Sequence, residues 1–333
     1  MHRDATFDLS KGLAMFMVIY SHVIFYRPGF ELKTMPSLAI NFIMVVAMPL
    51  FFMLSGYFSS KLHKSRNWSD LFRRFTVYFW PMAFFSFVFN CIDCLILGRY
   101  PVAQFPLNVF KTFLFAGWFF YALAFCDFIV FCTFRFDELW KKFSFFIFAL
   151  CVCFIGSGRL WHVDNVIQMM PFYIFGLVLV PVIIRNYRLW LATAFLGLSA
   201  LICVTYFCGN IATNGMSFYW NKIDVFCLDV HKIINYFLRI VVGTLGCLFI
   251  LLVLRKLTLL SWVKKIAFVG TETLGMYFLQ GWLIRTFVLP WIGLDACVLI
   301  LLLASSCVFL LAFTMVKILK VNKNICGLVF GKK

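Results

Sequence analysis

Charged residues are scarce in this sequence, and acidic ones are the scarcest. Only 13% of the 333 residues are charged, and 13 Asp and Glu stand against 30 Lys and Arg. Soluble proteins carry roughly a quarter of their residues as charged side chains, so this composition excludes a soluble globular protein. The chain is instead 64% hydrophobic and contains 45 Phe. These values indicate an integral membrane protein.

Histidine is also rare, with five in the chain, and patterns for metals or nucleotides are missing. Cys91 and Cys94 are the only cysteines at a spacing typical of metal ligands, and no histidine stands near them. The sequence has no glycine-rich phosphate loop, internal repeat or low-complexity tract. We therefore expect no metal, and interpret the 13 cysteines as small apolar residues of helices.

The long apolar runs predict helices, because hydrocarbon offers no partners for backbone polar groups and the runs lack strand-like alternation. Most connections between them are short. The prediction is an all-α polytopic integral membrane protein that forms a single domain over 1–333, without an appended soluble domain. About ten transmembrane helices are expected, at 9–26, 37–58, 72–97, 113–134, 143–156, 166–184, 189–208, 233–254, 270–290 and 294–319.

The distribution of Lys and Arg predicts the orientation, since cytoplasmic loops carry an excess of both. A cytoplasmic N-terminus places 21 of the 30 basic residues inside, so both termini are expected in the cytoplasm. A basic inner surface that faces anionic membrane lipids accounts for much of the net charge of +17, and nucleic acid is not needed to explain it. The expected location is a cell membrane, the inner or plasma membrane of a bacterium, crossed several times.

The first helix carries two ionisable residues on one face. Lys11 and His22 are eleven residues apart, which on a helix means about 20° in direction and about 16 Å in rise. Asp8 lies close to the same direction and is placed to pair with Lys11. Singly, Lys11 could snorkel and His22 could reach interfacial water. Together they are costly against lipid and indicate a site inside the helix bundle.

Asp127 lies in the middle of the helix expected at 113–134, where a lipid-facing carboxylate has no good explanation. Three roles are open for it. It could orient His22 through the other ring nitrogen, pair with a basic residue, or remain a neutral acid.

Several other polar residues within the spans are candidates for substrate binding. Ser55 and Tyr57 could approach a cavity, although Ser-Gly in a membrane helix is also typical of a close helix contact. Trp118 and Tyr121 could stack on a sugar or belong to the interfacial aromatic belt. Tyr277 and Gln280 share one face of the helix at 270–290, which is expected to point inward.

The segment FDLSKGLAMFMVIYSH resembles the first helix of the acyltransferase 3 family of membrane O-acyltransferases, whose signature is a basic residue, ten intervening residues and a histidine. Lys11 and His22 match it. Further similar segments follow in the family's order, at PLFFMLSGYF (49–58), Arg74 to Pro81, GWFFYAL (117–123), MPFYIFGLVL (170–179) and LGMYFLQ (274–280). Two positions depart from the family pattern: Val77 replaces a second arginine, and Gln280 replaces a histidine.

The resemblance implies an O-acetyltransferase with acetyl-CoA as the acyl donor. Its nucleotide would lie near Lys11, Arg73 and Arg74, and its pantetheine arm would run toward His22, whose imidazole suits a general base. The implied acceptor is a hydroxyl of a cell-surface glycan or of its lipid-linked precursor. Because Gln280 keeps hydrogen bonding but has no proton chemistry, it is not expected to act as an acid or base.

Two other classes of function are compatible with the sequence. In a proton-coupled transporter of a small solute or glycan precursor, Asp127, His22 and Lys11 would line the path of the proton or substrate. The interrupted helices in matching halves that are typical of such transporters are not evident. In a non-catalytic membrane partner subunit, the loss of histidine at position 280 would be tolerated.

Overall fold

The computed structural model describes residues 4–26, 38–65, 67–156, 163–186, 191–192, 195–197, 199, 230–292 and 297–331. It is 90% helix, and no strand occurs in these ranges. The elements are α1 (Ala5–Phe25), α2 (Leu38–Ser65), α3 (Trp68–Cys91), η2 (Ile92–Ile96), η3 (Val102–Gln104), α4 (Phe105–Ala116), α5 (Trp118–Arg135), α6 (Leu139–Gly156), α7 (Val163–Arg185), α10 (Val230–Leu257), α11 (Ser261–Ile266), η4 (Ala267–Thr271), α12 (Thr273–Leu283), η5 (Ile284–Val288), α13 (Val298–Val321) and α14 (Lys323–Phe330).

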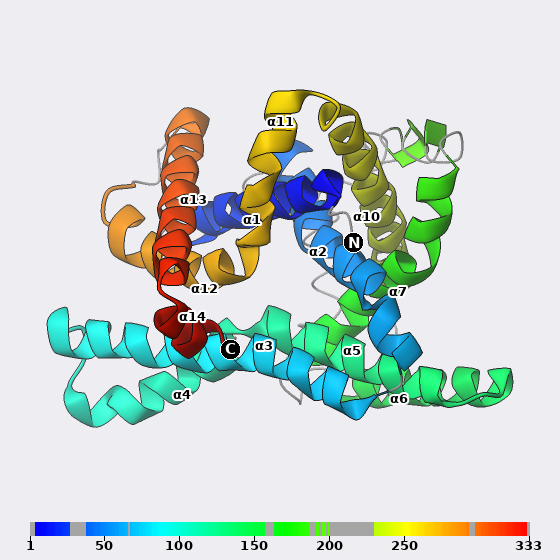
Figure 1. Cartoon of the computed structure of the whole chain (residues 1–333), viewed down its shortest axis with the longest axis horizontal. Coiled ribbons are helices and arrows are strands. Elements are labelled where there is room, and N and C mark those ends of the chain that lie inside the picture. Colours follow the sequence, from blue (N-terminus) through cyan, green and yellow to red (C-terminus); the bar gives the residue numbers. More distant parts are fainter. Residues whose placement is uncertain are drawn as a thin grey trace.

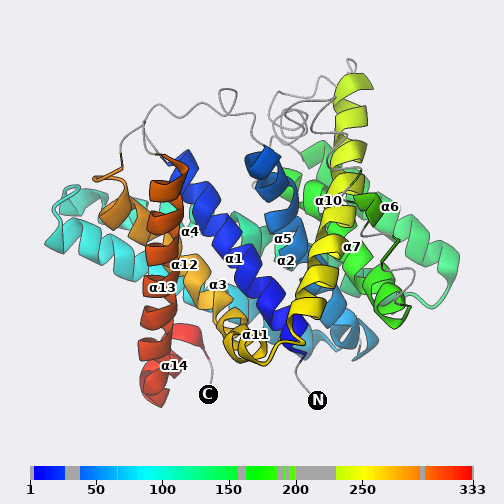
Figure 2. The ribbon, with the colours of Figure 1, turned by 90° about the horizontal axis from the view of Figure 1, so that it is seen from above.

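Helix α1 lies at the centre of the molecule. It runs obliquely between α13 and α10 (Figure 2) and also packs on α2, η4 and α12. Asp4 caps its start by accepting a hydrogen bond from the backbone N–H of Thr6. A helix that is apolar almost all round must be covered on several sides. The polar residues of α1 are therefore enclosed by the bundle.

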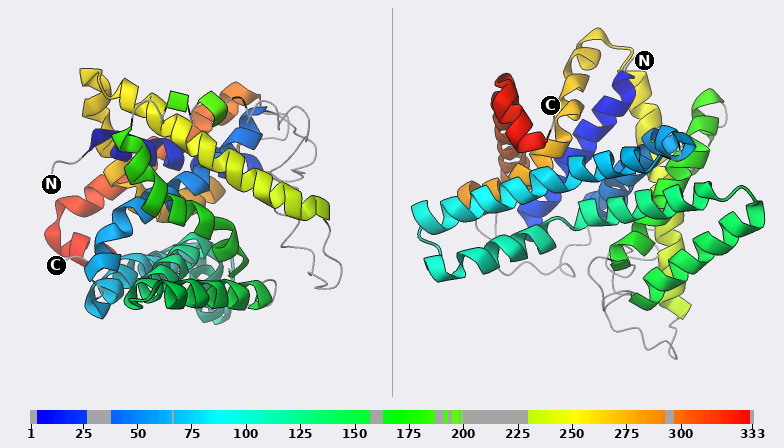
Figure 3. Two further views of the ribbon diagram at one scale, coloured as in Figure 1. Left: turned by 90° about the vertical axis from the view of Figure 1, so that its right-hand side faces the viewer. Right: turned by 60° about the horizontal axis from the view of Figure 1, so that its bottom comes forward.

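The other helices form two groups around α1 (Figure 1). Helices α3, α5 and α6 run across one side, and α10, α11 and α13 stand on the other. In the right-hand view of Figure 3, α3 lies alongside α4 and α5, as their contacts also show.

Helices α2 and α7 touch backbone to backbone through two glycines. A Cβ on Gly56 would lie 1.9 Å from the carbonyl oxygen of Tyr173, and a Cβ on Gly176 would lie 1.8 Å from that of Met53. Small residues let membrane helices approach this closely. The sequence left open whether the Ser55-Gly56 segment forms a close helix contact or faces a cavity. Gly56 forms the close contact, and its neighbour Ser55 lines a cavity.

Within the residues that the structure describes, seven helices are long and apolar enough to cross a membrane, at Ala5–Phe25, Phe42–Ser60, Trp68–Ile96, Trp118–Arg135, Asn165–Ile184, Tyr236–Leu257 and Val298–Val321. The span expected at 143–156 lies within α6, and the one at 189–208 falls mostly outside the described residues. The segment at 270–290 is divided into η4, α12 and η5. The count of ten and the orientation remain predictions.

One helix boundary differs from expectation. The helix predicted at 113–134 is interrupted at Gly117, where α4 ends and α5 begins. A Cβ at Gly117 would lie 1.9 Å from the sulfur of Met82, so the side chain of Met82 on α3 fills the space beside this break. The spanning helix therefore starts at Trp118, which lines two of the cavities described next.

Candidate active site

Three cavities meet at Tyr277. The first, called the Lys11 cavity, has a volume of about 210 Å³ and is lined by Lys11, Ser55 and Tyr78 among others. The second, of about 460 Å³, lies between α3, α4 and α12; the third, of about 450 Å³, lies between α1, α2, α7 and α10. We call them the α3–α12 cavity and the α7–α10 cavity. His22 and Trp118 line both, and Tyr277 lines all three.

His22 is held by Gln280. Its Nδ1 atom lies 2.8 Å from Oε1 of Gln280, whose side chain is buried with 3% exposed. The imidazole also stacks on the ring of Tyr26, with centroids 5.2 Å apart. Because Oε1 is an acceptor, this contact requires hydrogen on Nδ1 and leaves the lone pair on Nε2. With Oε1 as the acceptor, Nε2 is the nitrogen of His22 that can take up a proton.

Lys11 lies about three turns before His22, next to its predicted partner. Its Nζ is 3.9 Å from Oδ1 of Asp8 and 4.4 Å from the centre of the Phe58 ring. The adjoining wall is η4, which approaches α1 so closely that a Cβ on Gly270 would lie 1.6 Å from the carbonyl oxygen of Asp8. Gly270 is a structural requirement of this end of the site that the sequence alone did not reveal.

Aromatic rings separate Lys11 from His22. Tyr277 packs on Phe119 and Phe120 with ring centroids 5.1 and 5.0 Å apart. Both phenylalanines line the Lys11 cavity but neither of the two His22 cavities. A molecule that reaches from Lys11 to His22 must therefore pass the ring of Tyr277.

Asp127 belongs to a buried network with Arg74. The Nε atom of Arg74 lies 2.7 Å from Oδ2 of Asp127, and the hydroxyls of Tyr78 and Tyr173 both donate to the same carboxylate, which has 0% exposed. Of the three roles considered for Asp127, the structure shows pairing with a basic residue. The residue that contacts and orients the ring of His22 is Gln280, not Asp127.

Five of the predicted site residues do not line these cavities within the described part of the chain: Asp127 and Arg74, which form the buried network, and Arg73, Tyr57 and Tyr121. Arg73 is 80% exposed and pairs with Asp70 at 3.1 Å, because it lies on the outer face of α3. The ring of Tyr57 packs on Phe7 at 4.7 Å, and the hydroxyl of Tyr121 donates to the carbonyl oxygen of Phe113 at 3.3 Å.

Sequence reasoning did not propose three cationic residues and one glutamine that line the His22 cavities. Lys111 and Arg285 line the α3–α12 cavity, and Gln168 and Arg239 line the α7–α10 cavity. Arg239 could have been found, because it is an arginine within an apolar span, and such residues mark functional positions. The other three lie at or near the ends of the helices expected from the sequence, where polar residues are ordinary.

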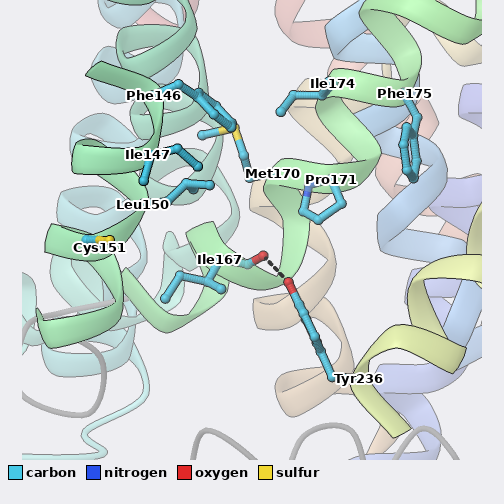
Figure 4. A pocket seen from close by; sticks show the side chains of 10 residues that line it. All are labelled: Phe146, Ile147, Leu150, Cys151, Ile167, Met170, Pro171, Ile174, Phe175 and Tyr236. Carbon is cyan, nitrogen blue, oxygen red and sulfur yellow. Dashed lines mark hydrogen bonds between the residues drawn. The ribbon is translucent and has the colours of Figure 1, made fainter. Parts of the chain in front are cut away.

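A further groove, of about 620 Å³, lies between α6, α7 and α10 (Figure 4). Its walls are nearly all aliphatic or aromatic, as with Phe146 and Leu150. The hydroxyl of Tyr236 donates to the carbonyl oxygen of Ile167 at 2.9 Å, which ties α10 to α7. The described lining of this groove contains no histidine and no charged residue.

Comparison with protein families gives one decisive match, to an acyltransferase domain model that covers residues 4–318. The chain belongs to the acyltransferase 3 family. The match includes α1 with Lys11 and His22, and it extends through most of α13. No curated protein and no solved structure matches significantly. Family membership and the apolar helices together indicate a multi-pass membrane acyltransferase.

Proposed function

We propose that this acyltransferase 3 protein is a membrane-bound O-acetyltransferase. It moves an acetyl group from cytoplasmic acetyl-CoA to a hydroxyl of a cell-surface glycan or of its lipid-linked precursor, with His22 as general base. The observation that carries the proposal is the contact of His22 Nδ1 with Gln280 at 2.8 Å, at a position shared by two cavities.

The step is a direct attack. The acceptor hydroxyl oxygen bonds to the thioester carbonyl carbon while His22 Nε2 takes the hydroxyl proton. The carbon–sulfur bond then breaks, and the imidazolium returns the proton to the departing thiolate of CoA. The products are an O-acetyl ester and CoA. Trp118 and Tyr277 line both cavities and carry N–H and O–H donors, which suits them to stabilise the carbonyl oxygen.

The donor would enter at the Lys11 end. Lys11 lines the Lys11 cavity and offers a positive charge to the phosphates of CoA. Arg74 is held by Asp127 and lies next to Tyr78, which lines the same cavity, so it adds a second positive charge near this end. Arg73, which is exposed, would add positive charge at the entrance. The rise of about 16 Å from Lys11 to His22 then corresponds to the span of the pantetheine arm. Ser55, Tyr57 and Tyr121 take part in no step of this mechanism.

The experiment uses sealed inverted membrane vesicles that contain the protein and acetyl-CoA labelled in the acetyl group. Transfer of label to glycan or lipid-linked saccharide supports the enzyme, and no transfer with intact vesicles contradicts it. A transporter would accumulate a solute and leave the saccharide unlabelled. With purified protein and no acceptor, direct attack leaves the peptide containing His22 unlabelled, whereas an acyl-histidine intermediate would label it.

A further inference from the structure

The α7–α10 cavity contains a buried cation close to His22. Arg239 has only 4% of its surface exposed, and its Nη1 donates to Oε1 of Gln168 at 3.1 Å. Both residues line the same cavity as His22. A buried arginine near the start of an apolar span marks a candidate functional position, because charged side chains are rare in such spans.

The rest of this cavity is mostly apolar. Helix α2 lines it with Ile43, Met44, Ala47 and Met48, and α1 adds Val18 and Phe25. Apart from His22, Arg239 is the one ionisable cationic side chain in its described lining. The complementary ligand therefore has one anionic group next to an apolar part, and a guanidinium fork matches phosphate in geometry as well as in charge.

The cavity is placed where an acceptor would arrive. His22 and Phe25 lie near the end of α1, while Asn165 and Gln168 lie near the start of α7. In the predicted orientation these ends are all on the outer side of the membrane. Lys11, by contrast, opens on the cytoplasmic end, so donor and acceptor would approach His22 from opposite sides.

The position of Arg239 is fixed by its neighbours on α10. One turn earlier, Tyr236 donates to the carbonyl oxygen of Ile167, and the bond from Arg239 to Gln168 follows on the next residue of α7. These two contacts join α7 and α10 directly beside the cavity. The guanidinium is thus held in place before any ligand binds, which lowers the entropy cost of binding.

We propose that the α7–α10 cavity is the acceptor site and that Arg239, positioned by Gln168, binds a phosphate of the acceptor. The acceptor is then a lipid-linked saccharide, whose phosphate joins the sugar to an apolar chain. The role of this cavity as the acceptor site rests on the proposed function. What is added is the chemical class of the acceptor and the residue that selects it, Arg239.

Native mass spectrometry of the full-length protein in micelles tests the site without requiring transfer. The probes are decyl glucosyl phosphate, decyl glucoside and glucose 1-phosphate. Decyl glucoside lacks the phosphate of the first probe, and glucose 1-phosphate lacks its alkyl chain. Wild-type protein should bind the first probe best. Arg239→Gln should weaken that binding about tenfold or more, as expected for the loss of a charged hydrogen bond. Arg239→Lys, which keeps the charge, should bind to an intermediate degree.

Arg255→Gln is the matched control, because Arg255 is an exposed arginine at the other end of α10. It should bind the phosphate probe as the wild type does. Equal binding by Arg239→Gln and wild type would overturn the proposal, and so would equal binding of the two decyl probes. If glucose 1-phosphate binds as well as the decyl phosphate, the lipid-linked class is wrong and the phosphate site stands. Acetyl-CoA added to the same samples tests the donor separately, so failure of the acetyltransferase and failure of this site give different results.

Discussion

The Nδ1 atom of His22 lies 2.8 Å from Oε1 of Gln280, although the two residues are 258 positions apart. This bond joins α1 to α12, and His22 lines both the α3–α12 cavity and the α7–α10 cavity. Position 280, where the family pattern has histidine, thus holds the imidazole of His22, which is the base of the proposed mechanism. The chemistry at this pair is the first thing to test.

Replacing His22 by alanine should reduce acetyl transfer by about 100-fold or more, because general-base catalysis contributes roughly that much. The protein should still accumulate in the membrane, since no backbone bond is lost. Transfer of labelled acetyl groups and the amount of membrane protein are both measured. A variant that keeps a third of the wild-type rate would exclude His22 as the base.

Replacing Gln280 by leucine should lower the rate about tenfold without changing the KM for acetyl-CoA. The substitution removes one hydrogen bond, worth roughly 1 kcal/mol, and releases the imidazole from its tautomer. Gln280→Glu should retain more activity, because a carboxylate also accepts from Nδ1. If leucine and glutamate behave alike, the orienting role of position 280 is wrong.

Replacing Lys11 by alanine should raise the KM for acetyl-CoA by about 10-fold or more, as expected for the loss of a charge-assisted contact to phosphate. Lys11→Arg should be milder because it keeps the charge. Initial rates at varied acetyl-CoA and fixed acceptor measure this. An effect confined to the acceptor would show that Lys11 does not anchor the donor.

Replacing Asp127 by leucine should destabilise the protein by about 3 kcal/mol, because Arg74 and the hydroxyls of Tyr78 and Tyr173 lose their common acceptor. The Tm of purified protein should fall accordingly. The double variant Asp127→Leu with Arg74→Met should recover part of the lost stability, because it no longer buries an arginine without its carboxylate. A normal Tm for the single variant would contradict the importance of this ion pair.

The orientation can be tested by cysteine labelling from each side of the membrane. Position 65 and the C-terminus should react from the cytoplasm, and position 215, which lies outside the described residues, should react from the other side. Ends on opposite sides would mean an odd number of spans. The segments at 143–156 and 189–208 would then be re-examined first.

The sequence alone determined the class of protein and the content of α1. Without water in the hydrocarbon layer, apolar runs have to be helices, so the all-α membrane fold could be predicted from composition and run length. The shared face of Lys11 and His22 follows from the helical period, a property of neighbours along the chain. The pairing of Lys11 with Asp8 could be predicted for the same reason.

Contacts between distant helices were decided only by the tertiary structure. Arg73 and Arg74 are chemically identical neighbours, yet their side chains point about 100° apart on α3, and the packing of α3 on α5 selects Arg74 as the partner of Asp127. In the same way the packing of α12 on α1 brings Gln280 to His22, and that of α10 on α7 brings Arg239 to Gln168. Helical periodicity predicts which residues share a face, but it does not predict which other helix that face meets.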